Sequence, residues 1–322
     1  MMNQIIQCVP NFSEGRRPEV VKAIVDTLRN IEGFVLVGAE PDADYNRTVV
    51  TLIGEPQAIV DALIPFVGKA LELINMNHQS GEHPRMGAVD VIPFIPIANV
   101  TMDDCVGYAN EIGRRIYDTF QIPSFLYANA ATKPDRVKLP NIRKGEFEGM
   151  KDKIKDPKWT PDFGTNEIHP TFGVIGIGAR IPLIAYNIDL ATEDLNPAKQ
   201  ISRAIRFSTG GFRHVQAGPV YLDSRGHVQV TMNILDYKEN PLYRILETVK
   251  MEAKRYQVDV LSCELVGLIP KQALLDSIRY YCQVHNEPFD KNMSYETMIQ
   301  RSKTYMGFRD LDVLKIIEAN LK

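Results

Sequence analysis

The chain has 322 residues, 44% of them hydrophobic and 24% charged, values typical of a globular protein with one or two domains. A formal net charge of −3 provides no basic field that would attract nucleic acid or anionic lipid, so neither is an expected partner. Four scattered cysteines without a CxxC pair, a start unlike a signal peptide and no apolar run of about 20 residues predict a cytoplasmic protein with reduced thiols.

Hydrophobic periodicity in the first part of the chain predicts alternating strands and helices. Short apolar or β-branched runs indicate the strands, and apolar residues at a spacing of about 3.6 indicate the helices. The expected elements are a strand over 5–10, a helix over 18–29, strands over 34–38 and 47–54, a helix over 56–73, a strand over 89–97, a helix over 102–120 and a strand over 124–127. The first six follow the β-α-β-β-α-β order of ferredoxin-like folds.

The second half repeats this order. The expected elements are a strand over 181–188, a helix over 197–207, a hairpin of strands over 215–222 and 228–235, a helix over 241–255, a strand over 258–266, and final helices over 271–283 and 310–321. We therefore predict an α+β fold (an α/β sandwich) of two ferredoxin-like βαββαβ lobes with an interlobe cleft. The N-terminal subdomain would span residues 1–179 and the C-terminal one residues 180–322.

A polar and charged segment, residues 129–163, lies between the two halves. It contains many basic residues among acids and prolines, which is typical of a solvated connector, and contact with a polyanionic ligand is the alternative. The glycine-rich stretch 173–180 resembles a dinucleotide-binding loop only superficially. It precedes an expected strand, whereas a Rossmann loop follows a strand and begins a helix.

The loop Gly81–Ala88 is the main candidate for chemistry. It places His83 beside an acid and Arg85 directly before an apolar strand. Histidine transfers protons near neutral pH, although a single histidine in a charged loop is more often a surface residue. Arg85 could bind a substrate carboxylate or form a salt bridge with a local acid such as Glu82 or Asp90. No spacing of His83 with another ligand predicts a metal site.

Two further segments could contribute to a site. The acidic turn 40–44 follows a strand, and one of its carboxylates could orient an imidazole, although most turn acids are simply solvated. The stretch 163–172 mixes aromatic, amide, acidic and hydroxyl side chains without a regular period. It could surround a heteroaromatic ligand, or it could be an ordinary loop with Phe172 as its core anchor.

Six segments together resemble the formiminotransferase family, and they occur in the family's order over nearly the whole transferase domain. They are CVPNFSEG at 8–15, NRTV at 46–49, GEHPRMGA at 81–88, VTMD at 100–103, PDFG at 161–164 and LVGLIP at 265–270. The resemblance implies transfer of a formimino group from N-formimidoyl-L-glutamate to N5 of tetrahydrofolate, a step of histidine degradation. It also implies two ferredoxin-like lobes, tetrahydrofolate as a co-substrate without a metal, and a homodimer. The chain ends without a cyclodeaminase domain, so a stand-alone transferase is expected.

The resemblance assigns site residues one by one. The family's catalytic histidine corresponds to His83, expected to act as general acid and base with a pKa near 7. Its associated carboxylate corresponds to Glu40, where the family usually has aspartate. The folate segment corresponds to Gly164, Thr165, Asn166, Glu167, Ile168, His169, Pro170, Thr171, Phe172 and Gly173. His169 and Phe172 replace the aliphatic residue and tryptophan common in relatives. A formyl donor, N-formylglutamate, and a non-catalytic folate-binding protein remain the alternatives.

Overall fold

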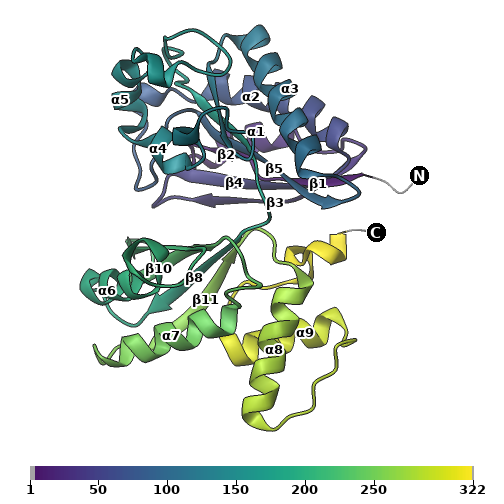
Figure 1. Cartoon of the computed structure of the whole chain (residues 1–322), viewed down its shortest axis with the longest axis vertical. Coiled ribbons are helices and arrows are strands. Elements are labelled where there is room, and N and C mark those ends of the chain that lie inside the picture. The colour runs from purple at the N-terminus through teal and green to yellow at the C-terminus, as the bar shows by residue number, and fades with distance from the viewer. Residues whose placement is uncertain (1–3, 321–322) are drawn as a thin grey trace. The chain divides into compact units, whose positions relative to one another are not determined.

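The computed structural model describes residues 4–320 as a mixed α+β protein with two β-sheets, one in each of two compact units (Figure 1). Unit 1 extends to Ile181 and unit 2 begins at Pro182. Every candidate site residue named above lies in unit 1. Among residues 4–320, no helix is both long and apolar enough to cross a membrane.

The sheet of unit 1 is mixed. Its strands are β1 (Ile5–Cys8), β2 (Asn11–Phe12), β3 (Phe34–Asp42), β4 (Arg47–Gly54), β5 (Val89–Ala98), β6 (Ser124–Ala128) and β7 (Ile175–Ala179). β1 and β2 follow one another between β4 and β5, and β3 pairs with the outer side of β4. β7 then pairs in parallel with both β5 and β6. The sheet is therefore a β-α-β-β-α-β unit extended by two parallel strands.

β7 is a strand that the sequence analysis did not predict. The glycine-rich stretch was expected to precede a strand, but it is itself a buried strand of the sheet. Its glycines are required by close packing: a Cβ on Gly178 would lie 2.6 Å from the Tyr127 ring, and one on Gly176 would lie 2.8 Å from Met86 Cε. The run of small residues concealed the strand because glycine is uncommon in strand interiors.

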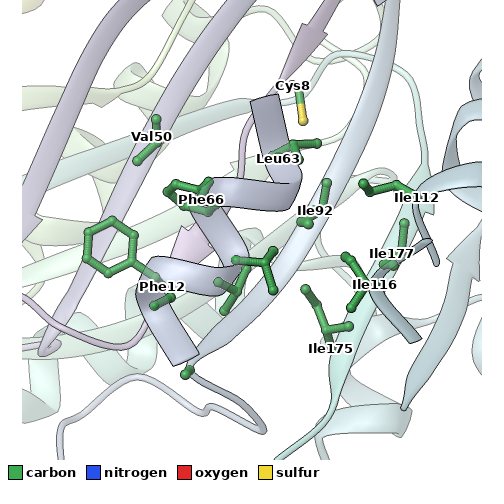
Figure 2. Packing of buried hydrophobic residues seen from close by; sticks show 14 of the residues in the cluster. Cys8, Phe12, Val50, Leu63, Phe66, Ile92, Ile112, Ile116, Ile175 and Ile177 are labelled. Carbon is green, nitrogen blue, oxygen red and sulfur yellow. The ribbon is translucent and has the colours of Figure 1, made fainter. Parts of the chain in front are cut away.

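Three helices pack their apolar residues against the unit 1 sheet: α1 (Pro18–Asp26), α2 (Pro56–Leu73) and α3 (Met102–Phe120). Figure 2 shows this core, in which Phe66 of α2 makes an edge contact with Phe12 of β2 at a ring-centroid distance of 5.9 Å. Thr101 begins α3 with a capping box that includes Asp104. This packing gives the strands that carry the candidate site a rigid base.

The segment 129–163 is not a solvated connector throughout. It contains α4 (Leu139–Arg143) and α5 (Glu146–Lys153), which bury apolar residues against Met86, Val91 and Phe125. Its Arg136 is only 1% exposed and forms an ion pair with Asp162. The prediction missed this because the apolar residues that anchor the segment are few and lie between many charged ones.

The sheet of unit 2 is antiparallel. Its elements are β8 (Ile184–Leu190), α6 (Leu195–Ile205), β9 (Val215–Leu222), β10 (His227–Ile234), α7 (Leu242–Lys254) and β11 (Val260–Val266), with strand order β11-β8-β10-β9. α8 (Lys271–His285) and α9 (Tyr295–Met306) follow, and α9 was not predicted.

The helix expected over 310–321 is wrong for the described part of that range. Residues Val313–Lys315 and Ile317–Asn320 form short 3₁₀ turns, and Leu321 lies outside the described residues. The chain here forms a bridge with Ile269, which donates to the Lys315 carbonyl at 2.8 Å and accepts from the Ile317 amide at 3.0 Å. These backbone groups are consequently not available for an α-helix.

Candidate active site

The loop that carries His83 is held by segments distant in the sequence. Asn46 Oδ1 accepts from the Gly15 amide at 3.0 Å, and Asn46 Nδ2 donates to the Ser80 carbonyl at 2.7 Å. Gly81 packs so tightly against the β3–β4 turn that a Cβ there would lie 2.5 Å from the Tyr45 carbonyl oxygen. The segments 8–15, 46–49 and 81–88 therefore form one interlocked structure around the histidine.

His83 is half-buried, and the charges that act on it are those of arginine side chains. Its ring makes an edge contact with Tyr45, with 6.3 Å between ring centroids. Burial lowers the pKa of His83 well below its usual value, and the positive charges of Arg47, Arg143 and Arg85 act in the same direction. The expected pKa near 7 therefore needs correction: the imidazole is neutral at pH 7, the form that can act as a base.

The Arg85 guanidinium is already engaged within the protein. It donates to both carboxylate oxygens of Glu148, at 2.7 and 3.0 Å, to Glu146 at 2.6 Å and to the Gln79 carbonyl at 2.9 Å. These contacts favour the salt-bridge alternative, but the partners are on α5 rather than Glu82 or Asp90. They tie the His83 loop to α5, and a direct role of Arg85 in substrate binding stays a prediction.

Arg143 and Arg47 approach His83 from two other elements. Arg143, the last residue of α4, forms an ion pair with Asp90 of β5, whose other oxygen accepts from the Met86 amide at 2.9 Å. Arg47 begins β4, and its guanidinium lies over the Tyr45 ring, 5.3 Å from the centroid. His83 therefore experiences the positive charge of several guanidinium groups, an arrangement suited to an anionic ligand.

The segment 164–173 is connected directly to the His83 loop. The Ala88 amide donates to the Phe172 carbonyl at 2.8 Å, and the Val174 amide donates to the Met86 carbonyl at 3.0 Å. Gly173, with φ of +88°, forms a bridge with Gly87, and a Cβ on it would lie 2.3 Å from the Met86 carbonyl oxygen. The two segments singled out from the sequence thus adjoin in space.

Within this segment, the side chains divide into two groups. Thr165, Asn166 and Glu167 are exposed, whereas Phe172 is completely buried in the hydrophobic core of unit 1. The interpretation of Phe172 as a core anchor is therefore correct, and its ring is not presented to a ligand.

His169 shapes the turn of the same segment. Its Nδ1 accepts from the Phe172 amide at 3.1 Å, and burial lowers the pKa of its imidazole. An Nδ1 that accepts a backbone hydrogen bond belongs to a neutral ring with its proton on Nε2. His169 thus holds the backbone of the segment in place.

Glu40 lies on a strand rather than in a turn. β3 continues to Asp42, so Glu40 pairs with Val49 of β4 and is half-buried. Sequence reasoning ended the strand at Gly38 because acids and a proline follow. A supporting role for Glu40 beside His83 stays a prediction. Within residues 4–320, no group of three or more histidine, cysteine or acidic side chains is arranged to hold a metal ion.

Sequence reasoning did not assign roles to Arg47, Tyr45 or Arg143. Arg47 could have been noticed as a charged residue at the start of a strand whose other residues are mostly apolar. Arg143 was one of many basic residues in a segment expected to be solvated, and only its tertiary pairing with Asp90 distinguishes it.

Comparisons with known proteins identify the family of the chain. The formiminotransferase domain, N-terminal subdomain, matches residues 5–180, and the formiminotransferase domain matches residues 185–320. The chain is 43% identical over 292 residues to glutamate formimidoyltransferase of Streptococcus pyogenes, covering 91% of this chain and 98% of the relative. It is 40% identical to glutamate formimidoyltransferase of Thermoplasma acidophilum, covering 92% of this chain and 98% of the relative.

A third relative is longer than this chain. Formimidoyltransferase-cyclodeaminase of Rattus norvegicus is 39% identical over 87% of this chain, which corresponds to 53% of the relative. The two family matches together span almost all of the described residues, and the identities extend over most of the chain. The chain belongs to the formiminotransferase family.

Proposed function

We propose that the protein is a glutamate formimidoyltransferase. It transfers the formimino group of N-formimidoyl-L-glutamate to N5 of tetrahydrofolate and releases L-glutamate. One observation carries the proposal: a neutral, half-buried His83 among guanidinium groups, in a loop hydrogen-bonded to the segment 164–173. The relatives bearing this name at 40% and 43% identity, each covered over 98% of its length, support it.

The chemistry requires one proton to move between two nitrogen atoms. N5 attacks the amidine carbon, and the new N–C bond leaves a positive charge on N5 in a tetrahedral intermediate. Neutral His83 takes the N5 proton and then donates it to the glutamate nitrogen as the old C–N bond breaks. The imidazole returns to its neutral form, so the proton balance closes within one turnover. Such acid–base catalysis contributes about 10²–10⁴-fold.

Tetrahydrofolate would bind along 164–173. The exposed part of this segment, Thr165–Glu167, offers hydroxyl, amide and carboxylate groups that can hydrogen-bond to a pterin ring. The buried part, Phe172 and Gly173, fixes the segment to the His83 loop. A rigid connection between the binding segment and the base favours catalysis because both reacting groups are held in position.

The resemblance also suggests features beyond the site. We propose that both units are ferredoxin-like, because the unit 2 strand order β11-β8-β10-β9 places the fourth, first, third and second strands of the repeat side by side. Two subdomains over 1–179 and 180–322, an interlobe cleft, a cytoplasmic location and a homodimer stay predictions. Sedimentation velocity of the purified protein would test the dimer.

The decisive experiment assays the purified protein with tetrahydrofolate and either N-formimidoylglutamate or N-formylglutamate, and follows the absorbance of the folate product. We expect turnover with the formimino donor. His83→Ala should lower kcat by about 10²–10⁴-fold while tetrahydrofolate still binds in calorimetric titration. Turnover with the formyl donor alone would replace the proposed substrate, and folate binding without turnover of either donor would indicate a non-catalytic protein.

A further inference from the structure

Arg47 is a half-buried cation without an acidic partner within 4.0 Å among the described residues. Among residues 4–320, its side chain forms no hydrogen bond and no ion pair within 4.0 Å, and its Nε is buried without a partner. Its guanidinium lies over the face of the Tyr45 ring, 5.3 Å from the ring centroid. By contrast, the guanidinium groups of Arg85 and Arg143 each pair with at least one carboxylate.

The surroundings of Arg47 disfavour its positive charge. Burial lowers the pKa of Arg47, and the positive charge of Arg143 adds to this effect, with only partial compensation from Tyr45 and the carboxylates Asp42 and Asp90. Asp42 accepts from the Tyr45 amide at 2.9 Å, and Asp90 is paired with Arg143. An enclosed charge is usually paired, so an unpaired one calls for a specific explanation.

The position of Arg47 supplies that explanation. The Tyr45 ring contacts both the Arg47 guanidinium and the His83 imidazole. Among the arginines whose positive charge lowers the pKa of His83, Arg47 has the largest effect. A planar guanidinium with free N–H groups binds a carboxylate through two parallel hydrogen bonds. The reacting amidine carbon of the proposed donor lies only a few bonds from two carboxylates.

We propose that Arg47 binds a carboxylate of a substrate glutamate group beside His83 and thereby positions the reacting carbon. The inference rests on the proposed function, because a glutamate group occurs in both proposed substrates. The donor carries it next to the transferred group, and tetrahydrofolate carries it at its tail. Arg85 and Arg143, which are already paired within the protein, hold the loop and α4 in place around this position.

The test compares Arg47→Gln and Arg47→Lys with the wild type. For Arg47→Gln, we expect the KM for N-formimidoylglutamate to rise about 10- to 100-fold, the loss expected for one charge-assisted bidentate contact, with a smaller change in kcat. Arg47→Lys should recover part of this loss because it keeps the charge but not the fork geometry. Arg29→Gln, which removes an exposed arginine of a local ion pair outside the site, is the matched control.

Two further arms identify the source of the carboxylate. The first replaces the donor with its mono-amide analogues, and the second replaces tetrahydrofolate with tetrahydropteroate, which lacks the glutamate tail. The analogue that lacks the carboxylate bound by Arg47 should bind to the wild type more weakly than the complete substrate does. Arg47→Gln should bind this analogue and the complete substrate with nearly equal affinity. Such a result with the donor analogues supports the proposal, whereas such a result with tetrahydropteroate alone would assign the carboxylate to the folate tail and overturn the positioning of the reacting carbon. KM values for both substrates within twofold of the wild type in Arg47→Gln would overturn the proposal.

Calorimetric titration with L-glutamate separates this inference from the proposed function. We expect the wild type and Arg29→Gln to bind L-glutamate, and Arg47→Gln to bind it at least tenfold more weakly with unchanged thermal unfolding. If the wild type turned over neither donor but still bound glutamate through Arg47, the function would fail and the inference would stand. Equal glutamate affinity in the wild type and Arg47→Gln would refute the inference alone.

Discussion

The low pKa of His83 predicts a specific pH dependence of stability. In the unfolded chain, an imidazole has a pKa of about 6.5, whereas burial and three arginines lower the pKa of His83 well below that value in the folded protein. As the pH falls below about 6.5, the unfolded chain therefore takes up a proton that the folded site does not. The contribution of the neutral His83 to the free energy of unfolding is fully present above this pH and is lost as the pH falls toward the folded pKa.

The magnitude follows from proton linkage. Because the folded pKa lies well below 6.5, only the unfolded imidazole takes up a proton in this range, and this stabilises the unfolded chain by about 0.2 kcal/mol at pH 7.0 and by about 1.4 kcal/mol at pH 5.5. His83→Gln removes this contribution. We therefore expect the wild type to lose about 1.2 kcal/mol more stability than His83→Gln between these two pH values.

Urea unfolding followed by circular dichroism at pH 7.0 and 5.5 measures the difference, and an NMR titration of the His83 ring protons measures the folded pKa directly. His78→Gln, which removes an exposed imidazole five residues upstream, is the matched control. Equal stability losses in the wild type and His83→Gln, or a folded pKa at or above 6.5, would refute the reasoning.

Two other substitutions test the supports of the site. Phe172→Ala should reduce the free energy of unfolding by about 3–5 kcal/mol because its ring is completely buried, while Phe172→Leu should keep the KM for tetrahydrofolate within twofold. A selective rise in that KM for Phe172→Leu would instead indicate that the ring contacts folate. Arg85→Gln should cost about 1–2 kcal/mol by urea unfolding, because its partners Glu146 and Glu148 remain hydrated, and should change the donor KM little. A tenfold rise of that KM without loss of stability would restore Arg85 as a substrate ligand.

Much of the fold could be predicted because its elements have clear periods. The strands 47–54 and 89–97 and the helices 56–73 and 102–120 were expected within a residue of their observed bounds. The failures have particular causes. β7 consists largely of glycine and alanine with two isoleucines, so its strand character comes from pairing with β5 and β6 rather than from intrinsic preference. Residues 313–320 are held by backbone bonds to Ile269, a contact no local pattern records.

The site was predictable in its parts but not in its electrostatics. The loop around His83 and the segment 164–173 were both recognised, and the structure joins them through the Gly87–Gly173 bridge. The roles of the arginines could not be read from the sequence, because three similar side chains have different tertiary partners. Arg85 pairs with α5, Arg143 pairs with Asp90, and Arg47 has no acidic partner within 4.0 Å among the described residues.

This difference among the arginines explains how one imidazole could serve both halves of the reaction. With Arg47 unpaired, the cationic surrounding lowers the pKa of His83, and the ring is a neutral but weak base. A carboxylate bound to Arg47 would offset part of that charge and raise the pKa of His83 toward the value at which it can both accept and donate a proton. Arg85 and Arg143 would still hold the pKa of His83 below that of an isolated imidazole. The base would then become fully effective only when a substrate carboxylate is bound to Arg47, so a low pKa of His83 is compatible with its proposed catalytic role.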